Sequence, residues 1–265
     1  MRRLAVLLPV LLPVILLALP AAAAPTAVKL AAHQALYRLT LVNGRDQVIG
    51  ATGTMGYEVI DACRSWKVRQ RLDISVSGVD GTETHLVTRY VTTEAKDGRT
   101  FRFRMTQTTN GAITSQTQGE ARMERAGGPG IADYAKPEVK EVDLPPGTLF
   151  PMEHTAEVIR AAEAGRKFFT LPIFDGTDDS GAELSSIVPL DRSAPSPGRW
   201  KDLAALPSVV VHIAFFGLNT TEMLPEYEVG MRYWTNGVAN ALQMDFGDFV
   251  MAGKLIGFRL LPSRC

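Results

Sequence analysis

Alternation of apolar and polar residues constrains the fold of this chain more than any other feature. The clearest alternating runs cover residues 37–41, 66–76, 99–107, 227–233 and 238–246. Successive side chains of a strand point to opposite faces of a sheet, so a period of two predicts strands with one buried and one solvated face. The pattern therefore predicts a mainly β protein built from antiparallel strands.

Turn signals accompany these alternating runs. They are the dipeptides Asn43-Gly44, Asp80-Gly81, Asp97-Gly98, Asn110-Gly111 and Asn236-Gly237. Asn-Gly and Asp-Gly favour the tight turns that join antiparallel strands, because both positions tolerate positive φ angles. The spacing predicts a meander of hairpins rather than a parallel α/β sheet.

Two segments depart from the alternating pattern. Residues 209–216 are apolar at nearly every position, which predicts a strand buried on both faces or at the centre of the fold. We interpret His212 within it as a core histidine, with a catalytic role as the alternative. Residues 151–164 predict a helix that packs on the sheet, since Pro151 suits a first helical position and Gly165 follows as a C-cap.

The first residues match the pattern of an export signal. Arg2 and Arg3 precede an apolar run over residues 4–19, and small residues follow at 21–24. This predicts a cleaved signal peptide over residues 1–23 and a single β-rich periplasmic domain over residues 24–265. A transmembrane helix is the alternative, but the run is shorter than the ~20 residues that span a bilayer, and Pro9 and Pro13 would interrupt it. We expect no transmembrane segment after cleavage.

The chain has only two cysteines, Cys63 and Cys265. In an oxidising compartment a pair of cysteines favours a disulfide, and the alternative is two unrelated free thiols. The large separation of the pair, with no histidine beside either cysteine, argues against a zinc site or a redox motif.

Charge and motifs exclude several function classes. The 28 basic and 28 acidic residues balance, whereas a nucleic-acid-binding protein usually carries a basic stripe. The acidic run over residues 175–179 resembles half of a calcium loop, but its glycine and final glutamate are misplaced, so we interpret it as a hairpin tip. We interpret His154 as a neutral structural contact at the start of the predicted helix. No catalytic motif stands in its required context, so we expect no enzyme, no metal and no cofactor.

Several sequence blocks together resemble one known family. They are His33-Gln34-Ala35-Leu36-Tyr37, Gly56 to Cys63 with Trp66, Phe150 to Thr155, Phe174-Asp175-Gly176, Pro225 to Glu228, Asn236-Gly237-Val238, Asp245 to Phe249, and the tail from Leu261 to Cys265. Their order and spacing are similar to those of the cell envelope integrity protein EipB family of alphaproteobacteria, from about His33 to the C-terminus. The resemblance implies a periplasmic protein with a bent, many-stranded antiparallel sheet called a β-spiral and one or two short helices packed on it. It also implies a disulfide between Cys63 and Cys265, a role in envelope integrity and a tetratricopeptide-repeat partner in the periplasm. It brings no enzymatic residues.

Two function classes follow from these expectations. In the first, a non-catalytic factor supports the envelope by binding another protein, or a cell-wall or outer-membrane component, through a sheet edge or groove. In the second, a carrier or sensor shelters a lipid, a lipoprotein acyl chain or another apolar ligand on its concave sheet. The fold alone does not separate the two classes.

Overall fold

The computed structural model describes residues 28–45, 47–218, 223–263 and 265. The predicted signal peptide, residues 1–23, lies outside the described residues. The described chain forms fourteen strands and two helices. The strands are β1 (His33–Gly44), β2 (Val48–Asp61), β3 (Ser65–Gly78), β4 (Glu83–Ala95), β5 (Thr100–Thr109), β6 (Ala112–Met123), β7 (Gly130–Lys136), β8 (Lys140–Leu144), β9 (Phe169–Ile173), β10 (Glu183–Ser193), β11 (Ser208–Gly217), β12 (Tyr227–Trp234), β13 (Ala239–Asp245) and β14 (Phe249–Leu260). The helices are α1 (Pro151–Glu163) and α2 (Lys201–Ala204).

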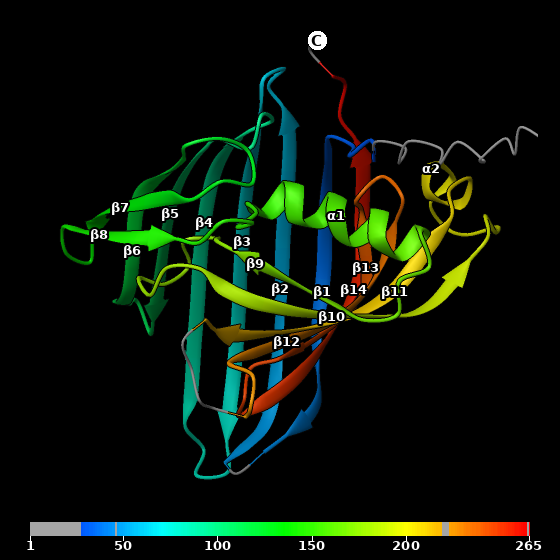
Figure 1. Cartoon of the computed structure of the whole chain (residues 1–265). Coiled ribbons are helices and arrows are strands. Elements are labelled where there is room, and N and C mark those ends of the chain that lie inside the picture. Colours follow the sequence, from blue (N-terminus) through cyan, green and yellow to red (C-terminus); the bar gives the residue numbers. More distant parts are fainter. Residues whose placement is uncertain (1–27, 46, 219–222, 264) are drawn as a thin grey trace, which may run out of the picture.

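All fourteen strands belong to one antiparallel sheet (Figure 1). Strands that follow one another in the chain are neighbours in the sheet, except β8 and β9, which form its two ends. The first strand, β1, pairs with the last strand, β14, and so joins two arms, β1–β8 and β9–β14. The expectation of a mainly β, single-domain, many-stranded antiparallel sheet is confirmed, and the sheet remains open between β8 and β9.

Four of the five predicted turn dipeptides lie between consecutive strands. Asn43-Gly44 does not: it forms the last two residues of β1, which pair with Val250 and Phe249 of β14. Asn110-Gly111 joins β5 to β6, and Asn236-Gly237 joins β12 to β13. Gly111 and Gly237 both have a φ of +83°, a conformation that costs glycine little and other residues more. These turns and the alternating burial of β1 and β5 explain why the sequence pattern predicted a meander.

Helix α1 lies across the strands of the sheet, alongside β9 and β10 (Figure 1). Pro151 is its first residue, as predicted, and Gly165 follows its C-cap with a φ of +81°. The helix buries one stripe against the sheet: Met152, Ala156, Val158, Ile159 and Ala162. Neither α1 nor α2 has the length and hydropathy that a membrane-crossing helix requires.

The N-terminus of α1 is capped by a residue from a distant strand. The N-cap position, Phe150, supplies no side-chain hydrogen bond. Instead, the carboxylate of Glu94 on β4 accepts hydrogen bonds from the backbone N–H groups of Met152 at 2.8 Å and Glu153 at 2.9 Å. Glu94 is only 2% exposed. A buried carboxylate thus satisfies two N–H groups that a helix terminus leaves without partners, and it ties α1 to the β1–β8 arm.

The structure also corrects the expectations for β11. This strand was expected to be buried on both faces or to lie at the centre of the fold, but its first residues alternate between buried and half-buried positions, so only one face is buried. His212 lies on the more open face, with 43% of its side chain exposed and its Nε2 atom 3.6 Å from a carboxylate oxygen of Glu228. The interpretation of His212 as a core histidine is therefore wrong. In a one-layer sheet only one face of a strand packs against the interior, even when both faces are apolar.

Candidate ligand-binding cavity

A cavity of about 570 Å³ lies between the two arms of the sheet. The β1–β8 arm lines it with Tyr37, Met55, Tyr57, Val59, Gln70, Leu72, Thr88, Tyr90, Met105 and Gln107. The β9–β14 arm lines it with Glu183, Phe215, Tyr227, Val229, Met231, Tyr233, Ala239, Leu242 and Met244. Helix α1 contributes Met152 and Thr155, and the segment before β1 contributes Leu30 and Ala31. Apolar and aromatic side chains therefore dominate the walls.

The strand register brings these lining side chains together. Tyr37 on β1 lies opposite Met55 on β2, which in turn lies opposite Leu72 on β3. Tyr90 on β4 lies opposite Met105 on β5 in the same way. Residues that are paired across antiparallel strands share a face of the sheet, so these positions form one continuous apolar wall. The alternation read from the sequence is what places them on the inner face.

Tyrosine side chains place a few polar hydroxyl groups in the mostly apolar cavity. The hydroxyls of Tyr37 and Tyr90 donate hydrogen bonds to the backbone carbonyls of Ala239 at 2.8 Å and Asp175 at 2.5 Å. Within the described chain, the hydroxyls of Tyr57 and Tyr227 form no hydrogen bond. Burial raises the pKa of both phenols, so they stay protonated at neutral pH. These two hydroxyls are available to donate hydrogen bonds to a ligand.

Carboxyl groups gather near the start of β10. Burial first, and then the neighbouring acidic residues, raise the pKa of Glu183 to about 8. Oxygen atoms of Asp178, Glu183 and Glu226 lie within 4.8 Å of one another, close enough to share a cation. With a pKa of about 8, the Glu183 carboxyl is mostly protonated at neutral pH, which relieves the repulsion in the cluster. This end of the cavity disfavours a negatively charged ligand group.

The acidic run that the sequence placed at a hairpin tip forms the connection between β9 and β10. Asp175 accepts hydrogen bonds from the backbone N–H of Thr177 at 2.8 Å and from its hydroxyl at 2.7 Å. Asp178 accepts a similar pair from Ser180. These local bonds are typical of turns that aspartate initiates, and they agree with the interpretation as a tip.

His154 is the one histidine inside the fold that faces a hydroxyl. Its Nε2 atom lies 2.8 Å from Oγ of Ser185, and Ser185 donates its own proton to the backbone carbonyl of Leu171 at 2.8 Å. Burial lowers the pKa of His154 to about 4, so the ring is neutral. This arrangement supports a structural contact, with burial rather than the helix dipole as the cause of neutrality. His33, His85 and His212 have other neighbours and do not join it.

The two cysteines lie next to each other at the ends of central strands of the sheet. Cys63 lies in the turn between β2 and β3, and Cys265 follows β14. Their sulfur atoms are bonded, and their Cα atoms are 5.3 Å apart, a separation usual for a disulfide. The pair would hold the end of the chain against the β2–β3 turn, close to the β1–β14 seam between the arms.

Sequence reasoning left open whether the concave sheet shelters a ligand, and it missed the lining residues of the cavity and the role of Glu94. The inner face of β4 carries Tyr90, Thr92 and Glu94 among apolar neighbours, and an acidic residue on a buried face is a signal that a partner is nearby. The partner itself, the start of α1, lies 58 residues further along the chain. Only the folded arrangement reveals it.

Stability should fall as the pH rises from 6.5 to 8. Burial raises the pKa of Glu94 to about 7 and that of Glu183 to about 8, from ordinary values of 4.5. In this range the folded state holds protons that the unfolded state has released, so raising the pH favours unfolding. The lowered pKa values of His154 and His33 act in the opposite direction, mainly below pH 7, because unfolded imidazoles with an ordinary pKa of 6.5 are largely neutral above it. Urea titrations across this range should show the decrease.

Replacing Glu183→Gln should flatten this pH dependence, whereas replacing the exposed Glu163→Gln should leave it unchanged. A wild-type stability that is constant or rises between pH 6.5 and 8 would contradict the assignment of raised pKa values to these buried carboxyls.

Comparisons with known proteins agree along nearly the whole chain. The model of the EipB-like family matches residues 24–262. The cell envelope integrity protein EipB of Brucella abortus (strain 2308) is 31% identical over 248 residues, which cover 89% of this chain and 86% of the relative. The crystal structure of a β-barrel-like protein of a domain of unknown function from Brucella abortus superposes with a TM-score of 0.82 at 28% identity, covering 89% of this chain and 100% of that one.

Proposed function

The chain belongs to the EipB-like family, and from this premise we propose that it is a non-catalytic periplasmic protein that supports cell envelope integrity by binding an apolar ligand. The name of its Brucella relative supports the envelope role. The export pattern of residues 1–23 and the bonded cysteines support the periplasm as its location. The ligand class comes from the cavity.

The apolar cavity between the arms is the observation that carries this proposal. Its volume of about 570 Å³ falls within the range of ligand pockets. Tyr57, Met105, Phe215 and Met244 offer aromatic and thioether surfaces that adapt to a flexible chain. Of the two function classes, this geometry favours the carrier or sensor of a lipid, of a lipoprotein acyl chain or of another apolar molecule.

The polar points of the cavity narrow the chemistry of the ligand. The Tyr57 and Tyr227 hydroxyls can donate hydrogen bonds to an ester or amide carbonyl. The acidic side chains of Asp178 and Glu226, which lie beside the mostly protonated Glu183, disfavour a phosphate or carboxylate at that end of the cavity. An apolar chain with an uncharged or cationic polar group therefore fits better than a free fatty acid.

The surroundings of the histidines support binding rather than catalysis. The proton of Ser185 is donated to a backbone carbonyl, so His154 has no hydroxyl proton to remove. A general base needs such a nucleophile or a bound water within hydrogen-bond reach.

A variant that fills the cavity tests the proposal. Gln107 lines the cavity, and the adjacent Thr106 points to the opposite face of β5. Replacing Gln107→Trp should weaken binding of N-phenyl-1-naphthylamine, an uncharged dye that fluoresces in apolar surroundings, by about tenfold or more, because the indole occupies the ligand's space. Fluorescence titration of the two proteins measures the change.

Thr106→Trp is the matched control, since it adds the same indole outside the cavity and should leave dye binding within about twofold of wild type. Equal binding by the wild type and by a folded Gln107→Trp variant, or no dye binding by the wild type, would contradict a ligand site in this cavity.

A further inference from the structure

The outer face of strands β3–β5, which points away from the cavity, carries an excess of positive charge. Its basic side chains are Lys67, Arg69, Arg71, Arg89, Arg102 and Arg104, and the acidic side chains around them are Glu58, Asp73 and Glu120. The whole sequence has equal numbers of basic and acidic residues, so this face is a local concentration of cations. Such a face attracts an anionic partner.

Two of these arginines lie directly opposite each other. Arg71 on β3 pairs in register with Arg89 on β4, and like charges at such positions destabilise a sheet. Arg71 forms an ion pair with Asp73 at 2.6 Å. Arg89 and the nearby Arg104 form no ion pair or side-chain hydrogen bond with any residue that the structure describes. Their guanidinium groups are exposed and free to pair with carboxylates of another molecule.

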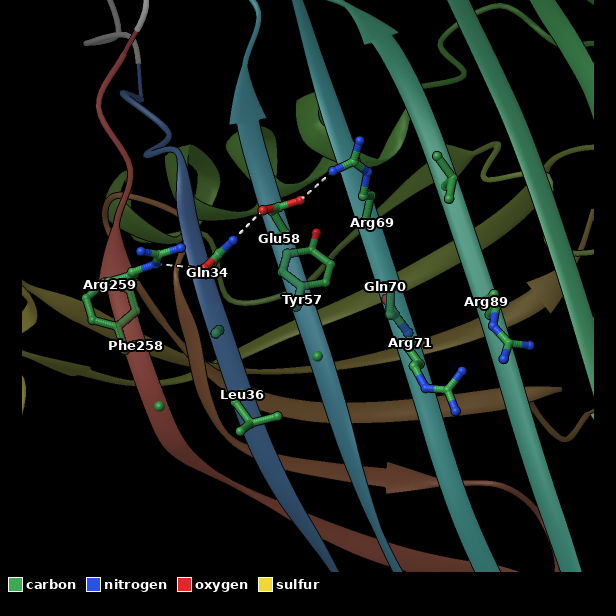
Figure 2. A pocket seen from close by; sticks show the side chains of 14 residues that line it. Gln34, Leu36, Tyr57, Glu58, Arg69, Gln70, Arg71, Arg89, Phe258 and Arg259 are labelled. Atoms are coloured by element: carbon green, nitrogen blue, oxygen red, sulfur yellow. Dashed lines mark hydrogen bonds and ion pairs between the residues drawn. The ribbon is translucent and has the colours of Figure 1, made fainter.

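A hollow lies beside Arg71 and Arg89 on the same face (Figure 2). Gly56 on β2 lies between Leu36 and Arg71 in the register, and a Cβ atom added at Gly56 would meet no atom within 4 Å. Gly257 on β14 lies on the other side of Leu36. Two missing side chains thus leave an open floor around Leu36, whose surface is 42% exposed. The hollow accepts an apolar group.

One wall of the hollow is held in place by its own hydrogen bonds. Arg259 donates to Gln34 at 2.7 Å, Gln34 donates to Glu58, and Arg69 pairs with Glu58 at 3.0 Å (Figure 2). The charged groups of Arg259, Glu58 and Arg69 are therefore already bonded to one another or to Gln34. Arg71 and Arg89, on the other side of the hollow, keep donors for a partner.

We propose that this outer face is a docking site for an acidic, extended peptide segment of a partner protein. An apolar side chain of the segment lies in the hollow over Gly56 against Leu36, and neighbouring carboxylates pair with Arg71 and Arg89. Acidic residues that flank an apolar residue in an extended segment place carboxylates near Arg71 and Arg89 when the apolar side chain lies in the hollow over Gly56. A flat layer of anionic lipid headgroups would pair with the arginines but would leave the hollow empty, so the shape favours a peptide. The site is separate from the cavity, on the opposite face of the sheet.

Fluorescence anisotropy of a labelled synthetic peptide tests this inference. The peptide carries one leucine with two glutamates on each side, and the same peptide with lysines in place of the glutamates serves as the charge control. The acidic peptide should bind saturably and the lysine peptide should not. Arg89→Glu should weaken binding by about tenfold or more, because reversal turns an attraction into a repulsion. Arg89→Gln provides a milder second variant.

Gly56→Val tests the hollow without removing a charge. The added side chain has open space and suits a strand, so the protein should fold normally while peptide binding falls by about tenfold or more. Two matched controls should stay within about twofold of wild type. Thr54→Val places a valine on the same strand and face, where it exchanges a hydroxyl for a methyl group, and Lys167→Glu makes the same charge reversal at an exposed position after α1.

Three results would overturn the inference. The first is the absence of peptide binding by the wild type. The second is evidence of unspecific charge attraction. Either an equal loss of binding in Lys167→Glu and Arg89→Glu or normal binding in a folded Gly56→Val variant would provide it. The third is co-sedimentation with phosphatidylglycerol vesicles that is abolished by Arg89→Glu but unchanged in Gly56→Val, which would identify the face as a membrane surface.

Discussion

Replacing Phe101→Ala should lower the free energy of unfolding by about 3–5 kcal/mol, as is typical for a phenylalanine removed from a packed core. Phe101 on β5 is fully buried, and its ring stacks on Phe150 at a centroid distance of 5.0 Å and meets Phe174 edge-on at 6.0 Å. Phe150 precedes α1, and Phe174 follows β9. The aromatic cluster therefore joins one arm to both the helix and the far end of the sheet. Urea denaturation followed by circular dichroism measures the change.

Phe168→Ala is the matched control, because the side chain of Phe168 is 62% exposed and its removal should change stability by no more than about 0.5 kcal/mol. A loss as small as this for Phe101→Ala would mean that the aromatic cluster does not hold the two ends of the sheet together.

Replacing Cys265→Ser should lower the free energy of unfolding by about 2–5 kcal/mol and keep a β-type circular dichroism spectrum. The bridge joins residues 202 positions apart, so it restricts the unfolded chain strongly. The folded state has thirteen pairs of neighbouring strands besides the bridge, enough to preserve the fold. Thermal unfolding of the two proteins measures the difference in Tm.

Reductant supplies an internal control for this prediction. Dithiothreitol should lower the Tm of the wild type to that of Cys265→Ser and should leave the variant unchanged. Equal Tm values for the oxidised wild type and the variant would show that the bridge is absent in solution or does not constrain unfolding.

The strands that the sequence predicted are those whose two faces differ in polarity. Along β3, Trp66, Val68 and Ile74 alternate with charged residues, and a glycine turn marks its end. No alternating run marked β2, β4 or β6 to β10. In β7 and β8 the reason is that short strands with Ala132, Ala135 and charged residues show no such contrast. Local patterns report one strand at a time, which is why they predicted hairpins but not their order in the sheet.

Features that depend on the pairing of strands far apart in the chain could not be predicted from the sequence pattern. The β1–β14 pairing joins the two ends of the chain and creates the space between the arms, yet neither strand carries a mark of its partner. Tyr57 and Tyr227 face the same cavity from opposite arms, although 170 positions separate them in the chain. In sequence each is an ordinary inward-facing tyrosine. Their shared role appears only when the register of all fourteen strands is known.

Native mass spectrometry of the protein purified from its native cells without detergent tests ligand binding most directly. We expect a population with the additional mass of an apolar molecule, which organic extraction releases from the wild type and from Thr106→Trp but not from a folded Gln107→Trp variant. A wild type that carries no such molecule and takes up none from mixed envelope lipids would show that the cavity between the arms does not bind an apolar ligand.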